Sequence, residues 1–463
     1  MAVKAADAPT PGDANNYGNN GGSGPAYGPL INYATNYTAL YLTTSLATNG
    51  LAQLILHNTS NAVPYEIIST DSLTNGPTNW TSEGLWLGLP TNTPATIAMG
   101  SRTKKLFFRA RVWTGEFDHG VPTNGQLFLM VNTNSIYPVI NGVTNQLTPF
   151  YRNWVMLNPP LYCVNLGYDA SDNGFTNSLV NTNPPQGVLK LVGFSPTLTN
   201  LCLSYNPLTN INVSSWPALQ DLECWHCTNM LSVSITNCPQ LSRVCFEAIQ
   251  YDSQHGILGS LDFTGCPNIA DVRAADNRLS NIIFAKGAGP RLWHLCVHDN
   301  SVYQLAINVD FSQFPSMSQL WIWNDNFGGP LNLSSVNCPN LSSVQASGNK
   351  FTSADFSGQT NLDQIWVWST DYYNPTLTNL NIAGCSRLRQ VEAYNQSLPS
   401  SVVDSVLIAL DQMGLSTDVA DGLEVLLDGG RNEAPSVEGR KAAESLKAKG
   451  WWVSFTPPPV GTP

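Results

Sequence analysis

Residues 292–300 read LWHLCVHDN, and this short stretch contains the pattern that decides the fold. Leu292, Leu295 and Val297 follow the spacing L-x-x-L-x-L, and Asn300 comes three residues after the last of them. The pattern returns every 21 to 28 residues, in copies that begin at Pro196, Pro217, Pro239, Pro267, Pro290, Pro315, Pro339, Thr360 and Ser386. Such a period is typical of a solenoid, in which each copy forms one coil and shares its core with the next. The sequence therefore predicts about nine stacked coils over residues 196–398.

The polar slot and the end of each copy add detail to this pattern. Many copies end in Cys-Pro or Cys-Ser, at Cys238, Cys266, Cys338 and Cys385. With the register L-x-x-L-x-L-x-x-N, the repeats resemble those of bacterial leucine-rich repeat surface proteins, of the short kind with a strand on each side of the coil. The Asn side chains are expected to bond the backbone of the neighbouring coil, although Asp325, Thr370 and Gln396 replace some of them. A right-handed parallel β-helix is the alternative architecture, because it also has short coils and Asn ladders.

The remaining segments divide around this array. Residues 1–29 are expected to be a flexible Gly- and Asn-rich segment, and residues 30–115 alternate with period two, which predicts a β-sandwich. This rhythm resembles the immunoglobulin-like modules of large bacterial surface proteins. Residues 116–195 are expected to be a connector and N-terminal cap. The pattern over residues 399–456 predicts a small α/β C-terminal cap with helices at 400–413 and 437–449. Residues 457–463 are expected to form a tail.

Composition limits the class of protein. Charged residues make up 11% of the chain, against about 25% in ordinary globular domains, so amides and hydroxyls keep the surface soluble. Because the net charge is -11 and only 21 residues are Lys or Arg, a nucleic-acid partner is not expected. No apolar run reaches the length of a membrane span. The polar surface is typical of an extracellular or cell-surface protein. Residues 1–29 hold no secretory signal, so we expect either that the signal has been removed or that the protein reaches the outside by another route, such as release within a virus particle.

Side chains that point away from the core should form two columns, because residues alternate along the first strand of each coil. The first predicted column is Cys202, Glu223, Cys245, Arg273, Cys296, Trp321, Gln345, Trp366 and Glu392. The second predicted column is Ser204, Trp225, Glu247, Ala275, His298, Trp323, Ser347, Trp368 and Tyr394.

Two tryptophan pairs stand out in these columns. One coil separates Trp321 and Trp323 from Trp366 and Trp368, so the pairs should lie roughly 9.6 Å apart and leave a slot for one flat ring. Exposed apolar patches usually mark binding sites. A sugar ring or a protein side chain would fit; the alternative is that the indoles stack on one another or pack against the protein itself. The predicted ligand-binding residues on this concave face are Trp225, Trp321, Trp323, Gln345, Trp366, Trp368, Glu392 and Tyr394.

Other combinations of residues give weaker signals. His294, Cys296 and His298 share a face but stand too far apart along one strand to bind one metal ion, and Cys224 and Cys227 are expected to be buried structural thiols. The ten Cys residues are expected to be free thiols. Glu223 and Glu247 could form a carboxylate pair for glycoside hydrolysis, but a solvated pair is favoured.

These observations predict a recognition or adhesion protein that is not an enzyme and needs no cofactor or metal. Its partner would be a glycan or a protein on the concave aromatic face. The alternative is a structural subunit of an extracellular filament, surface layer or virus particle, assembled through the Trp face. A polysaccharide-active enzyme that uses Glu223 and Glu247 is the outlying hypothesis.

Overall fold

The computed structural model describes most of the chain beyond residue 39. The described ranges are 40–46, 52–61, 63–71, 80–89, 95–98, 107–122, 124–133, 136–167, 187–248, 255–284, 291–300, 314–371, 375–416 and 422–458. The predicted flexible segment 1–29 lies outside them, as does most of the predicted tail. The chain forms two compact units: Met1–Tyr137, Asn145–Leu161 and Leu189–Pro196 make the first, and Pro138–Thr144, Tyr162–Val188 and Thr197–Pro463 the second.

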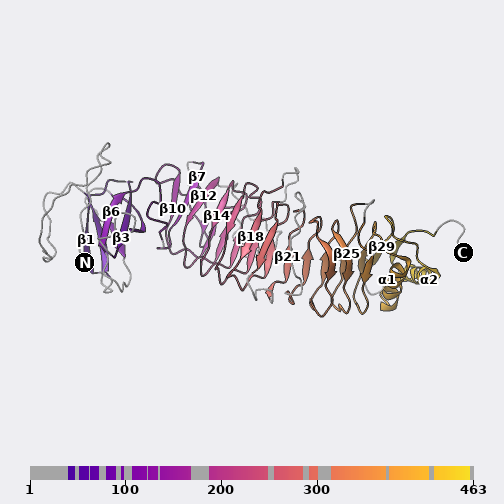
Figure 1. Cartoon of the computed structure of the whole chain (residues 1–463). Helices are drawn as coiled ribbons and strands as arrows, with labels where there is room; N and C mark the ends of the chain where they lie inside the picture. Colours follow the sequence, from indigo (N-terminus) through magenta and orange to yellow (C-terminus); the bar gives the residue numbers. More distant parts are fainter. Residues whose placement is uncertain are drawn as a thin grey trace. The chain divides into compact units, whose positions relative to one another are not determined.

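The N-terminal unit contains small antiparallel sheets (Figure 1). One joins β1 (Tyr41–Leu46), β2 (Ala52–His57) and β5 (Ala95–Ala98), and another joins β3 (Pro64–Thr70), β4 (Thr81–Leu87) and β6 (Phe107–Val112). Both contribute to one apolar cluster, in which Leu54 and Leu56 of β2 meet Ile67 of β3 and Phe108 of β6. The period-two alternation of residues 30–115 therefore predicted these strands correctly.

A third sheet of the same unit was only partly expected. It joins β10 (Trp154–Leu157), β7 (Leu127–Val131) and β12 (Val188–Gly193). Trp113, Phe128 and Trp154 are buried together beneath it. The sequence indicated β7 alone, because the other two strands lie among Pro- and Asn-rich stretches.

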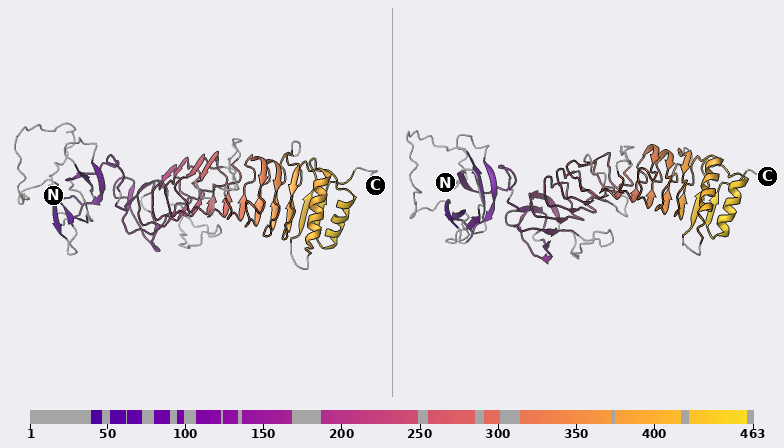
Figure 2. Two further views of the ribbon diagram at one scale, coloured as in Figure 1. Left: turned by 60° about the horizontal axis from the view of Figure 1, so that its bottom comes forward. Right: turned by 90° about the horizontal axis from the view of Figure 1, so that it is seen from below.

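The C-terminal unit is built on one long, mostly parallel sheet of short strands, consistent with a repeat solenoid (Figures 1 and 2). The sheet has 14 strands, and only β8 (Val139–Ile140) and β9 (Val143–Thr144) at its beginning are antiparallel. The parallel strands are β11 (Cys163–Asn165), β13 (Asn200–Cys202), β15 (Asp221–Glu223), β17 (Arg243–Cys245), β19 (Asp271–Arg273), β21 (His294–Cys296), β22 (Gln319–Trp321), β24 (Ser343–Gln345), β26 (Gln364–Trp366), β28 (Gln390–Glu392), β29 (Glu424–Leu427) and β30 (Trp452–Phe455). The central residue of each three-residue strand, such as Leu222 or Val344, is buried in the shared core.

Several coils carry a second short strand, as expected. These strands form three further parallel sheets: β14 (Asn210–Asn212) with β16 (Ser232–Ser234), β18 (Ser260–Phe263) with β20 (Asn281–Phe284), and β23 (Gly328–Asn332) with β25 (Lys350–Asp355) and β27 (Asn379–Asn381). Ile211, Leu261, Leu331 and Leu380 of these strands are buried. The second apolar triplet of each copy thus closes the core from the other side.

Side-chain amides tie one coil to the next, as the sequence predicted. The Nδ2 of Asn277 donates to the carbonyl of Phe246 in the preceding coil at 2.7 Å, and that of Asn349 donates to Ile322 at 2.6 Å. Gln396, which replaces Asn, makes the same bond to Val367. Buried peptide groups need partners, so this ladder satisfies carbonyls at every turn that carries an amide.

The long sheet begins earlier in the chain than the repeats suggested. β11 pairs in parallel with β13, and Val164 of β11 is fully buried together with Leu161 and Leu166 on either side of the strand. They follow the same L-x-x-L-x-L spacing. The Nδ2 of Asn206 donates to the Leu166 carbonyl at 3.0 Å, so this segment forms a further coil of the array.

At the other end, the chain adds two helices to the last coils (Figure 2). Helix α1 (Ser400–Met413) ends at Gly414, whose φ of 71° is left-handed, and helix α2 (Val437–Ala448) begins at Ser436, which accepts bonds from the N–H groups of Glu438 and Gly439. The two helices pack together, and α1 also contacts β27. Among the described helices, neither has the length and hydropathy needed to cross a membrane.

Candidate functional site

The register of the long sheet places the first predicted column in one row. Parallel pairing aligns Cys202 with Glu223, and each later strand continues the row in the predicted order, through Cys245, Arg273, Cys296, Trp321, Gln345, Trp366 and Glu392. Alternation and the repeat length were enough to predict this order.

The second column follows from backbone bonds just beyond the strands. The N–H of Asp299 donates to the carbonyl of Trp323, that of Asn324 to Ser347, and that of Gly348 to Trp368. Ser369 in turn donates to Tyr394. Trp323, Ser347, Trp368 and Tyr394 are therefore neighbours on successive coils, as predicted.

The indoles of this row lean on flanking side chains. Trp323 stacks on His298, with ring centroids 3.5 Å apart and planes 12° apart. Trp368 stacks on Tyr394 at 5.2 Å and 7°. Trp321 lies 6.4 Å from Trp323. Trp323 thus stacks on the preceding coil and Trp368 on the following coil. Ser347, on the coil between them, is 2% exposed.

The predicted residues near these pairs form a continuous group. We call the set Trp321, Trp323, Gln345, Trp366, Trp368, Glu392 and Tyr394 the aromatic face; each member is partly exposed. Trp225 does not belong to it, because β17, β19 and β21 separate its coil from that of Trp321. Trp225 packs instead on Tyr205 and His226.

Polar groups of the aromatic face are unevenly satisfied. In the part of the chain that the structure describes, the buried Nε1 atoms of Trp321 and Trp366 have no hydrogen-bond partner. At the C-terminal end of the face, burial raises the pKa of Glu392, and the charge of Glu424 raises it further. This end therefore offers a carboxyl that protonates more readily than an exposed one.

A network of buried charges lies on the coils before the aromatic face. The Nδ1 of His294 is 2.8 Å from Asp271 Oδ1, and Arg273 reaches the same carboxylate at 3.2 Å. Burial would raise the pKa of Asp271, but the bond and charge of His294, with those of Arg273, lower it. Asp271 and Arg273 lie on one coil and His294 on the next, so the contact between Asp271 and His294 links two successive coils.

The predicted solvated pair Glu223 and Glu247 is buried, which corrects that expectation. The two residues are 8% and 6% exposed. Glu223 pairs laterally with Cys245, and Glu247 accepts a bond from Cys296 at 3.4 Å. Neighbouring thiols cover the carboxylates, and burial raises the pKa of Glu247.

The cysteines and histidines also have separate partners. All ten Cys residues are free thiols, and eight are buried. Cys227 donates to the Leu203 carbonyl at 3.2 Å, which fits a structural role. His294 pairs with Asp271, Cys296 with Glu247 and His298 with Asp299, so this trio does not converge on one point.

One group on the same coils was missed by the sequence analysis. Asp276 and Asp299 each precede the Asn slot, at Asn277 and Asn300, on successive copies. Together with His298 they place one ligand atom each within 4.8 Å of the others. The Asp-Asn pair repeated after 23 residues was the available signal. Comparison with protein-family models gave no match, and a search among curated proteins found none either.

Proposed function

We propose that this chain is a non-catalytic recognition protein that binds its partner on the aromatic face. The observation that carries the proposal is that four indoles and one phenol remain partly exposed in register on neighbouring coils. Large exposed apolar groups cost free energy in water and usually mark binding sites. Ligand sites combine such surfaces with a few polar groups, and Gln345 and Glu392 supply these.

A glycan is the favoured partner. Trp323 stacks on His298 and Trp368 stacks on Tyr394, so both indoles are held in place before a ligand binds. Binding therefore costs little side-chain entropy at these two residues. Braced ring faces suit the flat faces of sugar rings. The amide of Gln345, between the two tryptophan pairs, and the carboxyl of Glu392, at the C-terminal end of the face, suit hydroxyl groups. A protein surface with the same chemistry is the other outcome of the test below.

We infer that the aromatic face belongs to a surface protein of leucine-rich repeat type, with an immunoglobulin-like module in its N-terminal part. Ten free thiols are unusual outside the cell. Eight of the ten are buried. For Cys338 and Cys385 burial raises the pKa to about 11, and an un-ionised, inaccessible thiol oxidises slowly. We propose that the protein works outside the cell, on a cell surface or in a virus particle, because only 11% of its residues are charged and amides and hydroxyls make up much of its polar surface.

The test is a panel of soluble glycans, followed by tryptophan fluorescence and calorimetry. Trp321→Ala and Trp366→Ala should each weaken binding about tenfold or more, because central aromatic residues dominate such interfaces. Trp225→Ala is the matched control, since it removes an indole about 19 Å away on the same sheet and should leave affinity unchanged.

Two results would contradict this assignment. Unchanged binding in both face variants would reject the aromatic face as the site. Polymers of the wild-type chain that the same two substitutions abolish would favour the structural-subunit alternative, and light scattering across a concentration series separates the two.

A further inference from the structure

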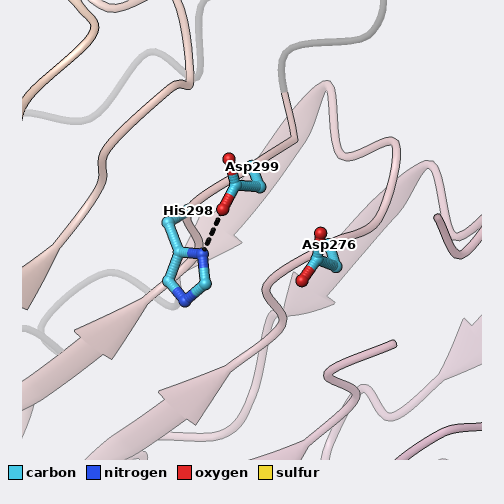
Figure 3. A group of neighbouring side chains, drawn as sticks. All are labelled: Asp276, His298 and Asp299. Atoms are coloured by element: carbon cyan, nitrogen blue, oxygen red, sulfur yellow. Dashed lines mark hydrogen bonds and ion pairs between the residues drawn. The ribbon is translucent and has the colours of Figure 1, made fainter. Parts of the chain in front are cut away.

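We propose that Asp276, His298 and Asp299, assisted by His255, form a binding site for a divalent transition-metal ion of the zinc type. The three side chains converge at the carboxyl ends of β19 and β21 (Figure 3). The proposal does not depend on the function of the aromatic face.

The repeat geometry creates the site. Asp276 and Asp299 occupy equivalent left-handed turn positions, with φ of 57° and 60°. The N–H of Asp276 donates to the His298 carbonyl at 3.0 Å, which holds the two turns in register. Tyr205, His226, Asn324 and Gly348 fill the same turn position on other coils. Only where two successive coils both carry Asp do carboxylates meet.

Hydrogen bonds already orient the ligands. Asp299 accepts from the Trp323 Nε1 at 2.9 Å and from the Asn324 Nδ2 at 2.8 Å, while its Oδ2 lies 2.8 Å from the His298 Nδ1. The stacked indole of Trp323 fixes the His298 ring. Outer partners of this kind hold metal ligands in position in known sites.

The local charge favours a cation. Within the described residues, the ion pairs of these carboxylates are with histidines: Asp276 with His255 at 3.1 Å and Asp299 with His298. The ligand atoms of Asp276 and Asp299 lie within 4.8 Å of each other, so the two carboxylates repel each other when both are ionised. A divalent ion would relieve this repulsion.

The donor atoms indicate which ion. Asp276, His298 and Asp299 supply two carboxylates and one imidazole, and three such protein ligands with a water molecule complete the four that Zn²⁺ prefers. His255 lies 3.1 Å from Asp276 and would act as its outer partner. Ca²⁺ and Mg²⁺ prefer six or more oxygen ligands. The His298 ring is 9% exposed, but Asp276 and Asp299 are 19% and 29% exposed, so an ion could enter from solvent.

The experiment uses the full chain, stripped of metal and titrated with Co²⁺ as a spectroscopic probe. We expect one equivalent to bind, with visible absorption of a nitrogen- and oxygen-ligated ion, and Zn²⁺ to displace it. Asp276→Asn should weaken binding at least about tenfold. His226→Ala, which changes a histidine at the equivalent turn position, is the matched control and should bind as the wild type does.

Several outcomes would overturn the proposal. These are the absence of stoichiometric binding, a spectrum dominated by thiolate charge transfer, displacement by Ca²⁺ as readily as by Zn²⁺, or unchanged affinity in Asp276→Asn. The unfolding temperature of each metal-free variant shows whether it has folded, and Asp299→Asn provides a second test if Asp276→Asn has not.

Discussion

At the residue scale, the polar slot of each coil explains both the regularity of the array and one weak point in it. Asn300 and Asn349 use both ends of their amides: each Nδ2 donates to a carbonyl of the preceding coil, and each Oδ1 accepts from a backbone N–H of Leu279 or Phe327. Asp325 fills the same slot with a carboxyl. Its Oδ1 accepts from Asn300 at 2.8 Å, but its buried Oδ2 has no partner among the described residues. An Asn amide would place an N–H donor at the position of this Oδ2, whereas an ionised carboxylate has no proton to donate there.

Replacing this carboxyl should therefore stabilise the protein. Burial raises the pKa of Asp325 well above its ordinary value, so the native state holds the proton more tightly than the unfolded state. Its contribution to stability is greatest at low pH and falls as pH rises through the folded-state pKa. Asp325→Asn should gain about 1 to 3 kcal/mol at neutral pH, with a smaller gain near pH 4.

Urea unfolding of both proteins from pH 4 to pH 8 measures this difference. Val336→Ala, at a residue that is 89% exposed, changes no titrating group and is the control. The difference in unfolding free energy between this variant and the wild type should be the same at every pH. A gain for Asp325→Asn that is absent, or that does not change with pH, would show that the buried oxygen costs nothing.

At the scale of the element, alternation and period predicted most of what the structure contains. Period-two alternation predicted strands within residues 30–115, and helical periodicity with end signals predicted both helices. Alternation combined with the repeat length predicted the order of both columns. The coil around β11 was missed because Leu161 and Leu198 stand 37 residues apart (198 minus 161), beyond the period of the later copies. The sequence pattern also does not predict the direction of side chains. It gives no sign that Trp323 stacks on His298 of the preceding coil while Trp368 stacks on Tyr394 of the following coil. The cluster of Asp276, His298 and Asp299 depends on that same packing.

If β11 belongs to the core of the array, its apolar residues should matter as those of a coil do. Leu166→Ala removes a fully buried side chain and should cost about 2 to 5 kcal/mol. Val143→Ala changes a residue of β9 that is 63% exposed and should change stability by less than about 0.5 kcal/mol. Denaturant unfolding followed by circular dichroism compares the two. Equal, small effects would mean that residues 161–166 only connect the units.

At the scale of the whole molecule, the C-terminal segment ends a sheet that would otherwise remain open. β28 pairs with β29, and Asn432 donates to the Ala393 carbonyl of the last repeat at 2.9 Å. Val403, Val406, Leu407 and Leu410 of α1 are buried at this end. Solenoids need such caps, because a terminal coil exposes both apolar core and unpaired backbone.

A chain that ends at Leu398 should therefore associate with itself and lose stability. Its β28 edge would offer free N–H and carbonyl groups to another molecule, and buried residues such as Leu398 would face water. Size-exclusion chromatography with light scattering should detect oligomers that the full chain does not form, together with a lower unfolding temperature. Removal of residues 459–463 alone is the control and should change neither quantity.

Because each coil is stabilised mainly by its neighbours, the loss of stability in the truncated chain should be largest in the coils next to the cut, around Trp366 and Tyr394, and smaller toward β13. Hydrogen exchange resolved along the chain would show this gradient, and uniform loss of protection would instead mean that the array unfolds as one cooperative body.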